Sequence, residues 1–302
     1  MTVINTNVKA LYTQAALKTT ERNSLRAMQE LSTGKRINSA KDDAAGLAIA
    51  ARMTQQIDGL NQGIRNAGDA IAMIQTTEGA TQNVTTMLLR ISELAMQAAN
   101  DTYSDVQRGF LNNEFTQLKE EIQRMSTTHE WNGFKILAGA ADGKTIVANT
   151  NNTPDTLGSS ELPKTLYFQV GDSADQRIKV DLPNFSKNGP VTKTIFADSA
   201  GVETSIATVA GAQNVIDLTK KVLDNVSESR SMMGAVMNRL EHVVDNLTNV
   251  SMNSAASRSQ IEDADYAKAS TDLAKSQIMS QAATAVLAQA NTSQQTVLKL
   301  LG

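Results

Sequence analysis

The sequence has no cysteine, only two histidines and few aromatic residues, and each shortage excludes a class of protein. Without cysteine the chain has no disulfide scaffold and no thiolate metal site. His129 and His242 lack acidic partners at ligand spacing, so we expect both at the surface and no catalytic, cofactor or metal site. Aromatics make up 4% of the residues against 41% apolar residues in all. Small and aliphatic side chains must therefore form the core, which suits helices packed on helices.

Long apolar runs and an excess of basic charge are also missing. No window holds 18 uninterrupted apolar residues, which argues against a membrane span. The net charge of −3 offers no basic surface for nucleic acid. The first residues lack the basic region and apolar run of a secretory signal peptide. Composition alone thus indicates a cytosolic protein, or one that is exported without disulfide chemistry.

Proline is confined to the middle of the chain, at Pro154, Pro163, Pro183 and Pro190. Because proline breaks helices, two proline-free arms flank a different central segment. Within the arms, apolar residues recur every three or four positions over 50–74, 111–125 and 215–250. This heptad-like spacing is typical of helices that pack in a coiled-coil-like seam. It predicts helices over about 5–33, 44–100, 106–127, 212–256 and 262–300.

Helix length indicates the molecular shape. A helix over 44–100 would be ~85 Å long, whereas a compact chain of this size has a radius of gyration of only ~19 Å. The molecule is therefore expected to be a rod, unless Gly79 or Asn100-Asp101 breaks the helix.

Local signals place several helix ends. Gly34 is expected to end the first helix in a left-handed conformation. Ser39–Asp42 has capping-box spacing, and Ser259–Glu262 has the box itself and is expected to open the last helix. The acidic pair Asp42-Asp43 and the run Glu262–Asp265 are read as helix caps rather than as catalytic or calcium-binding carboxylates.

The central segment, about 141–209, predicts a small β-rich module. Leu166–Val170 and Arg177–Val180 are β-rich and flank Gly171-Asp172-Ser173, so we expect a hairpin. Asn- and Thr-rich stretches such as Ala148–Thr153 predict surface loops. The fold class is therefore mainly α, an elongated coiled-coil-like rod built from the N- and C-terminal arms with a small central β module.

Each terminal helix carries a narrow apolar stripe that includes small residues. The candidate self-association residues are Ile4, Val8, Leu11 and Ala15 in the first helix, and Met279, Ala283, Val286, Ala290, Val297 and Leu300 in the last. Periodicity leaves two interpretations equally open. The stripes either form a coiled coil within one molecule, or they stay loose in the monomer and order against neighbouring copies.

The segment Leu31–Ala50, which reads LSTGKRINSAKDDAAGLAIA, closely resembles the N-terminal signature of bacterial flagellins. The opening Val3–Asn7, the segment Ser259–Ala269 and the last twenty residues or so are similar to the same family. Trp131–Leu137 resembles the family's Phe-Asn-Gly segment, with tryptophan in place of phenylalanine. The resemblance covers about 1–140 and 210–302 and leaves the middle unmatched.

The resemblance implies a non-enzymatic subunit of the bacterial flagellar filament that serves swimming motility. It implies a polymerisation core from 1–42 and 258–302, a rod from 43–140 and 210–257, and an outer module from 141–209. It also implies type III export to the extracellular flagellum, with junction proteins, cap proteins and a cytosolic export chaperone as partners besides the chain itself. The alternatives are a hook–filament junction protein and a soluble coiled-coil adhesin or signalling protein.

One further segment, Leu89–Asn100, resembles the part of flagellin that the vertebrate Toll-like flagellin receptor recognises. The resemblance assigns possible receptor contacts to Arg90, Leu94 and Gln97, which share a helical face, and to Glu114 on the following helix. Packing of one subunit against another explains the presence of these four residues better than receptor binding does. The heptad pattern also places Leu94 near the core.

Overall fold

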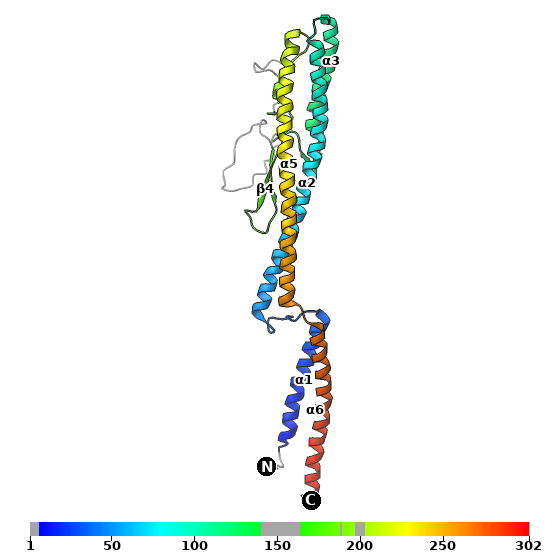
Figure 1. The fold of residues 1–302 in the computed structure, drawn as a ribbon. Helices are drawn as coiled ribbons and strands as arrows, with labels where there is room; N and C mark the ends of the chain where they lie inside the picture. Colours follow the sequence, from blue (N-terminus) through cyan, green and yellow to red (C-terminus); the bar gives the residue numbers. More distant parts are fainter. Residues whose placement is uncertain (1–5, 140–163, 188, 197–202, 302) are drawn as a thin grey trace. The chain divides into compact units, whose positions relative to one another are not determined.

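The structure is a computed structural model that describes residues 6–139, 164–187, 189–196 and 203–301. The chain divides into two compact units. The terminal unit comprises 1–58 and 251–302, and the central unit comprises 59–250. Figure 1 shows the course of the chain, with the N- and C-terminal helices next to each other.

In the terminal unit, α1 (Val8–Thr33) and α6 (Tyr266–Leu301) lie side by side (Figure 1), with Cα atoms within 8 Å of each other. The unit also holds the first turns of α2 (Ala44–Ala98) and the last turns of α5 (Val209–Glu262). Its buried apolar residues are few and mostly alanine, with Ile37 and Ile57 as the large ones. The pair therefore depends on close backbone approach rather than on bulky side chains.

The central unit contains the main hydrophobic core, formed by α2, α3 (Asp105–Thr128) and α5. Fully buried side chains come from all three helices: Ile74, Leu88 and Ile91; Phe115 and Ile122; Val215, Val222 and Leu240. Apart from Leu88 and Ile91, which lie beyond the predicted ranges, these positions follow the predicted three- and four-residue spacing, so the seam inferred from the sequence is part of the core of this bundle.

A small β module packs on the same core. Strands β3 (Lys164–Gln169) and β4 (Arg177–Leu182) form an antiparallel hairpin in which Phe168 faces Ile178. Alternate β4 residues, Ile178, Val180 and Leu182, are buried, as expected for a strand with one face on a core. A second hairpin joins β1 (Glu130–Trp131) to β2 (Phe134–Lys135), and a short helix α4 spans Lys193–Phe196.

The predicted fold class, mainly α with a small central β module, is confirmed, and so is the hairpin at 166–180. Helix α2 continues through Gly79 without a break. Gly34 has φ +70° and its N–H donates to the Glu30 carbonyl at 2.9 Å, which confirms the left-handed end of α1. The prediction of loops at 148–153 lies outside the described residues.

One helix boundary was predicted wrongly. Ser259–Glu262 does not open the last helix but forms the final turn of α5. The residue that caps α6 is Asp265, whose carboxylate accepts from the backbone N–H groups of Ala267 and Lys268 at 2.9 and 3.3 Å. The sequence offered two capping signals six residues apart, and α5 continues past the first because no proline or glycine interrupts residues 251–262.

The β1–β2 hairpin was not predicted. Asn132 and Gly133 have φ +48° and +76°, the left-handed conformation that both central residues of a type I′ hairpin turn require. The Asn-Gly pair was a readable signal, but strands of two residues carry no periodic pattern.

Candidate functional site

The inner seam between α1 and α6 is made of small residues. Ala10 and Ala27 of α1 are buried, as are Ala269, Ser276 and Ala290 of α6. Asn7 connects the two helices: its side-chain amide donates to the Ala290 carbonyl at 3.3 Å, and its Oδ1 caps α1 by accepting from the Ala10 N–H at 3.0 Å. A seam this narrow leaves the outer surfaces of both helices uncovered within the terminal unit.

Those outer surfaces are apolar. Leu11 is 55% exposed and Val286 is 56% exposed, which is unusual for large aliphatic side chains in a folded unit. The remaining exposed apolar residues of the pair are Val8, Tyr12, Leu25 and Met28 on α1, and Tyr266, Ile278 and Met279 on α6. We call this set, with Leu11 and Val286, the outer stripe. Its composition makes it a candidate interaction surface, because water contact with so much apolar area is unfavourable.

The structure divides the sequence-predicted association residues between the seam and the outer stripe. Val8, Leu11, Met279 and Val286 lie in the outer stripe, and Ala15 is exposed on α1. Ala290 is buried in the seam, at 8% exposure, and Ala283 is half-buried. Ile4 and the side chains of Val297 and Leu300 lie outside the described residues.

Sequence reasoning missed Tyr12, Leu25, Met28, Tyr266 and Ile278. The predicted stripe covers one face of each helix. A narrow seam, however, leaves apolar residues exposed over most of the remaining circumference of both helices. The signal was present, since apolar residues occur off the chosen stripe in both helices.

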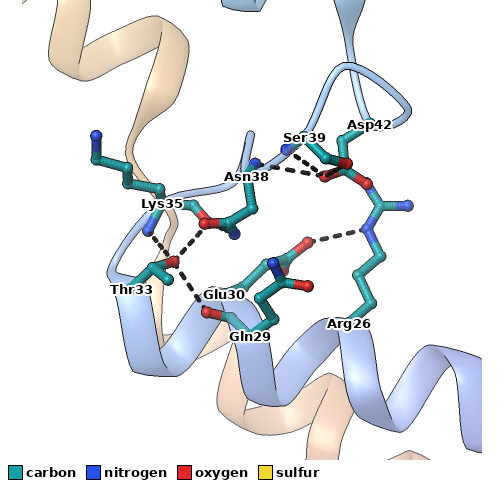
Figure 2. A network of polar contacts seen from close by, with 8 residues as sticks. All are labelled: Arg26, Gln29, Glu30, Thr33, Lys35, Asn38, Ser39 and Asp42. Atoms are coloured by element: carbon teal, nitrogen blue, oxygen red, sulfur yellow. Dashed lines mark hydrogen bonds and ion pairs between the residues drawn. The ribbon is translucent and has the colours of Figure 1, made fainter.

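A polar network holds the connection after α1 (Figure 2). Thr33 Oγ1 donates to the Gln29 carbonyl at 2.9 Å and accepts from the Lys35 N–H at 3.2 Å. Asn38 Nδ2 donates to the Lys35 carbonyl at 2.7 Å. Arg26 pairs with Glu30 at 3.1 Å and approaches Asp42 at 4.0 Å. The loop is therefore fixed to the last turns of α1.

Asp42 closes the second half of this loop. Its Oδ2 accepts from the Ser39 hydroxyl at 3.0 Å and from the N–H groups of Ser39 and Asn38 at 3.1 and 3.3 Å. The hydrogen bond from the Ser39 hydroxyl is the main cause that lowers the pKa of the Asp42 carboxyl, and the two backbone donors add to it. Asp43 caps α2 by accepting from the Gly46 N–H at 2.9 Å. The capping predicted for Asp43 is thus confirmed, whereas the predicted box at Ser39–Asp42 is wrong, because these two residues form a turn before the helix.

The same loop is tied to the connection between α5 and α6. The Arg36 N–H donates to the Glu262 carbonyl at 2.7 Å, and the Ala264 N–H donates to the Gly34 carbonyl at 2.9 Å. Lys35 Nζ forms an ion pair with Glu262 Oε1 at 2.6 Å. These bonds join the two arms of the chain where α1 ends and α6 begins, so the two helices share a common anchor.

The second candidate surface lies on α2 and α3 in the central unit. Arg90 Nε forms an ion pair with Glu114 Oε1 at 2.8 Å, and Arg90 Nη1 reaches Glu93 Oε2 at 3.1 Å. The hydrogen bond to Glu114 is the largest cause that raises the pKa of the Arg90 guanidinium. Gln97 is exposed and donates to the Tyr103 hydroxyl at 2.9 Å. Leu94 is only 1% exposed and belongs to the core, so the structure brings Arg90 and Glu114 together at the surface without Leu94.

Within the described ranges, no group of three or more histidine, cysteine, aspartate or glutamate side chains is placed to hold a metal ion. The ring of His129 contacts the Met125 carbonyl through Nδ1 at 3.1 Å. None of the described helices is long and apolar enough to cross a membrane.

Known proteins resemble this chain along its whole length. A family model for the bacterial flagellin N-terminal helical region matches residues 4–142, and one for the C-terminal helical region matches 216–301. The flagellin of Halalkalibacterium halodurans is 38% identical over 299 residues, which is 99% of both chains. The flagellar filament core protein flaB2 of Brachyspira hyodysenteriae and the flagellin of Bacillus subtilis are each 37% identical and are matched over 99% of both chains.

The two family matches fall on the arms that build the α1–α6 pair and the three-helix core, and they leave most of the β module between them. Relatives of this identity over the full length share the fold and the structural role. The chain belongs to the bacterial flagellin family, the structural and non-enzymatic subunits of the extracellular flagellar filament.

Proposed function

We propose that this chain polymerises into the filament through the outer stripe of α1 and α6, which neighbouring subunits cover. The observation that carries the proposal is the exposure of Leu11 and Val286, together with the other outer-stripe residues, on a helix pair with an alanine seam. Because different patches on each subunit would meet, the contacts are heterologous and give an open helical polymer rather than a closed ring.

The energetics allow such a mechanism. Burying ~1,000 Å² of apolar surface per subunit at ~25 cal/mol per Å² would contribute ~25 kcal/mol. Association and side-chain ordering cost an estimated ~4–15 kcal/mol or more, so a stable polymer is consistent with a dispersed monomer.

The test introduces charge into the stripe. Leu11→Glu combined with Val286→Glu should abolish seeded filament growth, since two carboxylates would have to enter apolar contacts. Gln14→Glu combined with Gln281→Glu adds the same charge at exposed polar positions of the same helices and should still polymerise. Negative-stain electron microscopy after seeding with ammonium sulfate gives the readout.

A truncation supplies a second measurement. A chain without 280–302 should remain folded and fail to polymerise, because α6 then loses Val286 and the Asn7–Ala290 contact. Normal filaments from either the stripe variant or the truncation would refute the mechanism.

The functional division follows from this mechanism. We propose 1–42 and 258–302 as polymerisation core, 43–140 and 210–257 as rod and 141–209 as outer module. The compact units, which end at residues 58 and 250, are defined by internal packing alone. The outer stripe also suits a cytosolic export chaperone before type III export, and junction or cap proteins at the filament ends, because each can cover an apolar helix face.

The hook–filament junction is the alternative role. Its proteins share the terminal architecture, so exposure of the stripe does not separate the two. Purified protein that grows long filaments on seeds is a filament subunit, whereas a junction protein stops at a short ring.

Recognition by the vertebrate Toll-like flagellin receptor is a second proposed activity. The exposed Arg90–Glu114 ion pair and the nearby Gln97 favour it, while buried Leu94 would support their helix from inside. Arg90→Ala should lower receptor signalling by monomer about tenfold, as expected for loss of one charged interface contact.

The control for this experiment is Arg124→Ala. Arg124 forms an exposed ion pair with Glu121 at 2.6 Å on α3. Arg124→Ala therefore removes a similar surface ion pair that does not belong to the proposed receptor contact. Equal signalling by the Arg90 and Arg124 variants in a receptor reporter assay would rule out the proposed contact.

A further inference from the structure

The central unit contains a cavity of about 600 Å³ between α2, the β1–β2 hairpin and β3. A cavity of this size is in the range that holds small molecules. Its lining includes Asp69 of α2, Trp131, Asn132 and Phe134 of the β1–β2 hairpin, and Tyr167 and Phe168 of β3.

Half of the lining residues are aromatic, although aromatics make up only 4% of the sequence. Trp131 and Phe168 pack against the main core, which fixes one side of the cavity, and Met73 is buried there. Tyr167 is 47% exposed. An aromatic wall has a negative π-face, which attracts cations most strongly when the site is partly desolvated.

Asp69 is the acidic residue of the cavity lining. It forms no hydrogen bond or ion pair with any residue that the structure describes. The closest basic residue along α2 is Arg65, one turn earlier, and its guanidinium is directed to Gln62 Oε1 at 2.5 and 3.1 Å instead. The carboxylate at the cavity is therefore not neutralised by its own helix.

The geometry points to a binding site for an organic cation that carries a quaternary ammonium group. Aromatic faces and one carboxylate complement a positive charge, whereas a sugar would need several hydrogen-bonding partners. A quaternary ammonium is weakly hydrated and has no N–H groups to satisfy, so it enters an aromatic site at lower desolvation cost than a lysine ammonium. The proposal concerns the monomer and does not depend on the mechanism of polymerisation.

The chain has a built-in reporter, because Trp131 is its only tryptophan. We expect choline chloride and tetramethylammonium chloride to change the Trp131 fluorescence saturably, with sodium chloride at equal ionic strength as the blank. The neutral carbon isostere of choline, 3,3-dimethylbutan-1-ol, should bind about tenfold more weakly, because it lacks the charge that the carboxylate and the π-faces attract.

Two matched variants separate the charge from the cavity. Asp69→Asn should weaken choline binding about tenfold and leave binding of the neutral isostere unchanged. Asp58→Asn removes an exposed carboxylate from the same helix and should bind choline as the parent chain does. Far-UV circular dichroism of both variants checks that the helices are intact.

Three results would overturn the inference. The first is that the fluorescence shows no saturable change up to roughly 100 mM choline, a concentration at which a millimolar site would be filled. The second is equal affinity for choline and for its neutral isostere. The third is that Asp69→Asn binds choline as tightly as the parent chain does. Failure of filament growth in the stripe experiment would not bear on any of them.

Discussion

Lys119 on α3 is a buried basic residue whose partners are neutral. Its Nζ lies 5.2 Å from the centre of the Phe115 ring and 5.8 Å from that of Phe196. It donates to the Thr204 carbonyl and hydroxyl at 3.2 and 3.3 Å. Lys119 thus connects α3 to residues on either side of the segment 197–202.

Burial lowers the pKa of the Lys119 ammonium below its ordinary value, and the charge of Glu203 only partly opposes this effect. A native pKa below the unfolded one means that the unfolded chain holds more protons between the two values. The free energy of unfolding should therefore rise with pH from the lowered pKa up to about 10.5 through this group.

Lys119→Met tests this linkage. The variant lacks the titrating group, so the stability of the parent chain relative to the variant should increase between pH 7 and pH 10, measured by denaturant unfolding. Lys220→Met, at an exposed lysine paired with Asp217, serves as the control and should show no such trend. Parallel pH profiles for all three chains would contradict the assignment.

Asp265 is the residue that starts α6. Asp265→Ala should destabilise the terminal unit by about 1 kcal/mol, because two backbone N–H groups lose their acceptor. Ser259→Ala removes the residue that the sequence favoured as cap and should cost less, since its hydroxyl only meets the exposed Asp263. Thermal melts followed by circular dichroism compare the stability of the two variants. A larger loss of stability for Ser259→Ala would show that Ser259, and not Asp265, caps α6.

Among the elements, the contact between the β3–β4 hairpin and α2 depends on glycine. A Cβ on Gly63 would lie 2.3 Å from the Val170 carbonyl oxygen, and one on Gly59 would lie 3.0 Å from the Asp172 Cβ. Asn66 completes the contact by donating to the Gln169 carbonyl at 2.8 Å. The four-residue spacing of the glycines places both under the hairpin turn.

Gly63→Ala should displace the hairpin and destabilise the central unit by about 1–3 kcal/mol, the usual cost of inserting a methyl group into a filled contact. Gly68→Ala on the same helix has no atom within 4 Å of the new Cβ and should stabilise by about 0.5–1 kcal/mol. Denaturant titration gives both values. Similar effects of the two substitutions would show that the hairpin does not lie on Gly63.

The long helices could be predicted from the sequence because their three- and four-residue apolar spacing repeats over many turns. The 3–4 spacing of α2 and α5 located both helices and most of the apolar residues that α5 buries, but only a minority of those that α2 buries. The β1–β2 hairpin and α4 were not predicted, because elements of two and four residues contain less than one period. The cavity at Trp131 could not be predicted either, since Asp69, Trp131 and Tyr167 are distant in sequence and meet only through tertiary packing.

The sequence predicted only part of the candidate association surface. Periodicity identified stripes on α1 and α6 but could not tell the seam from the outer face, because both contain apolar residues. Ala290 and Val286 belong to one predicted stripe, yet Ala290 is buried against α1 and Val286 is exposed. Side-chain size separates them, since the close approach of the helices admits alanine and excludes valine.

For the whole molecule, the two compact units differ in how much apolar side chain they bury. Regions with few buried contacts open at low free energy. In the monomer, amide hydrogens of α1 and α6 should exchange at least about 100-fold faster than those of α2 between Ile74 and Leu94, measured by mass spectrometry. The same amides should become protected in the filament, and equal protection of both regions in the monomer would refute the expectation.

The hydrogen bond between Asn7 and Ala290 joins residues 283 positions apart. At a synthesis rate of ~5–20 residues per second, roughly 14–57 s pass between the appearance of these two residues at the ribosome. Until Tyr266 and the residues after it have been made, α1 has no α6 to pair with, so the pair is the last contact of the terminal unit that can be completed. A chain still emerging from the ribosome therefore lacks the paired helices that the proposed mechanism of fibre growth requires, and on that mechanism the order of synthesis should by itself delay premature aggregation.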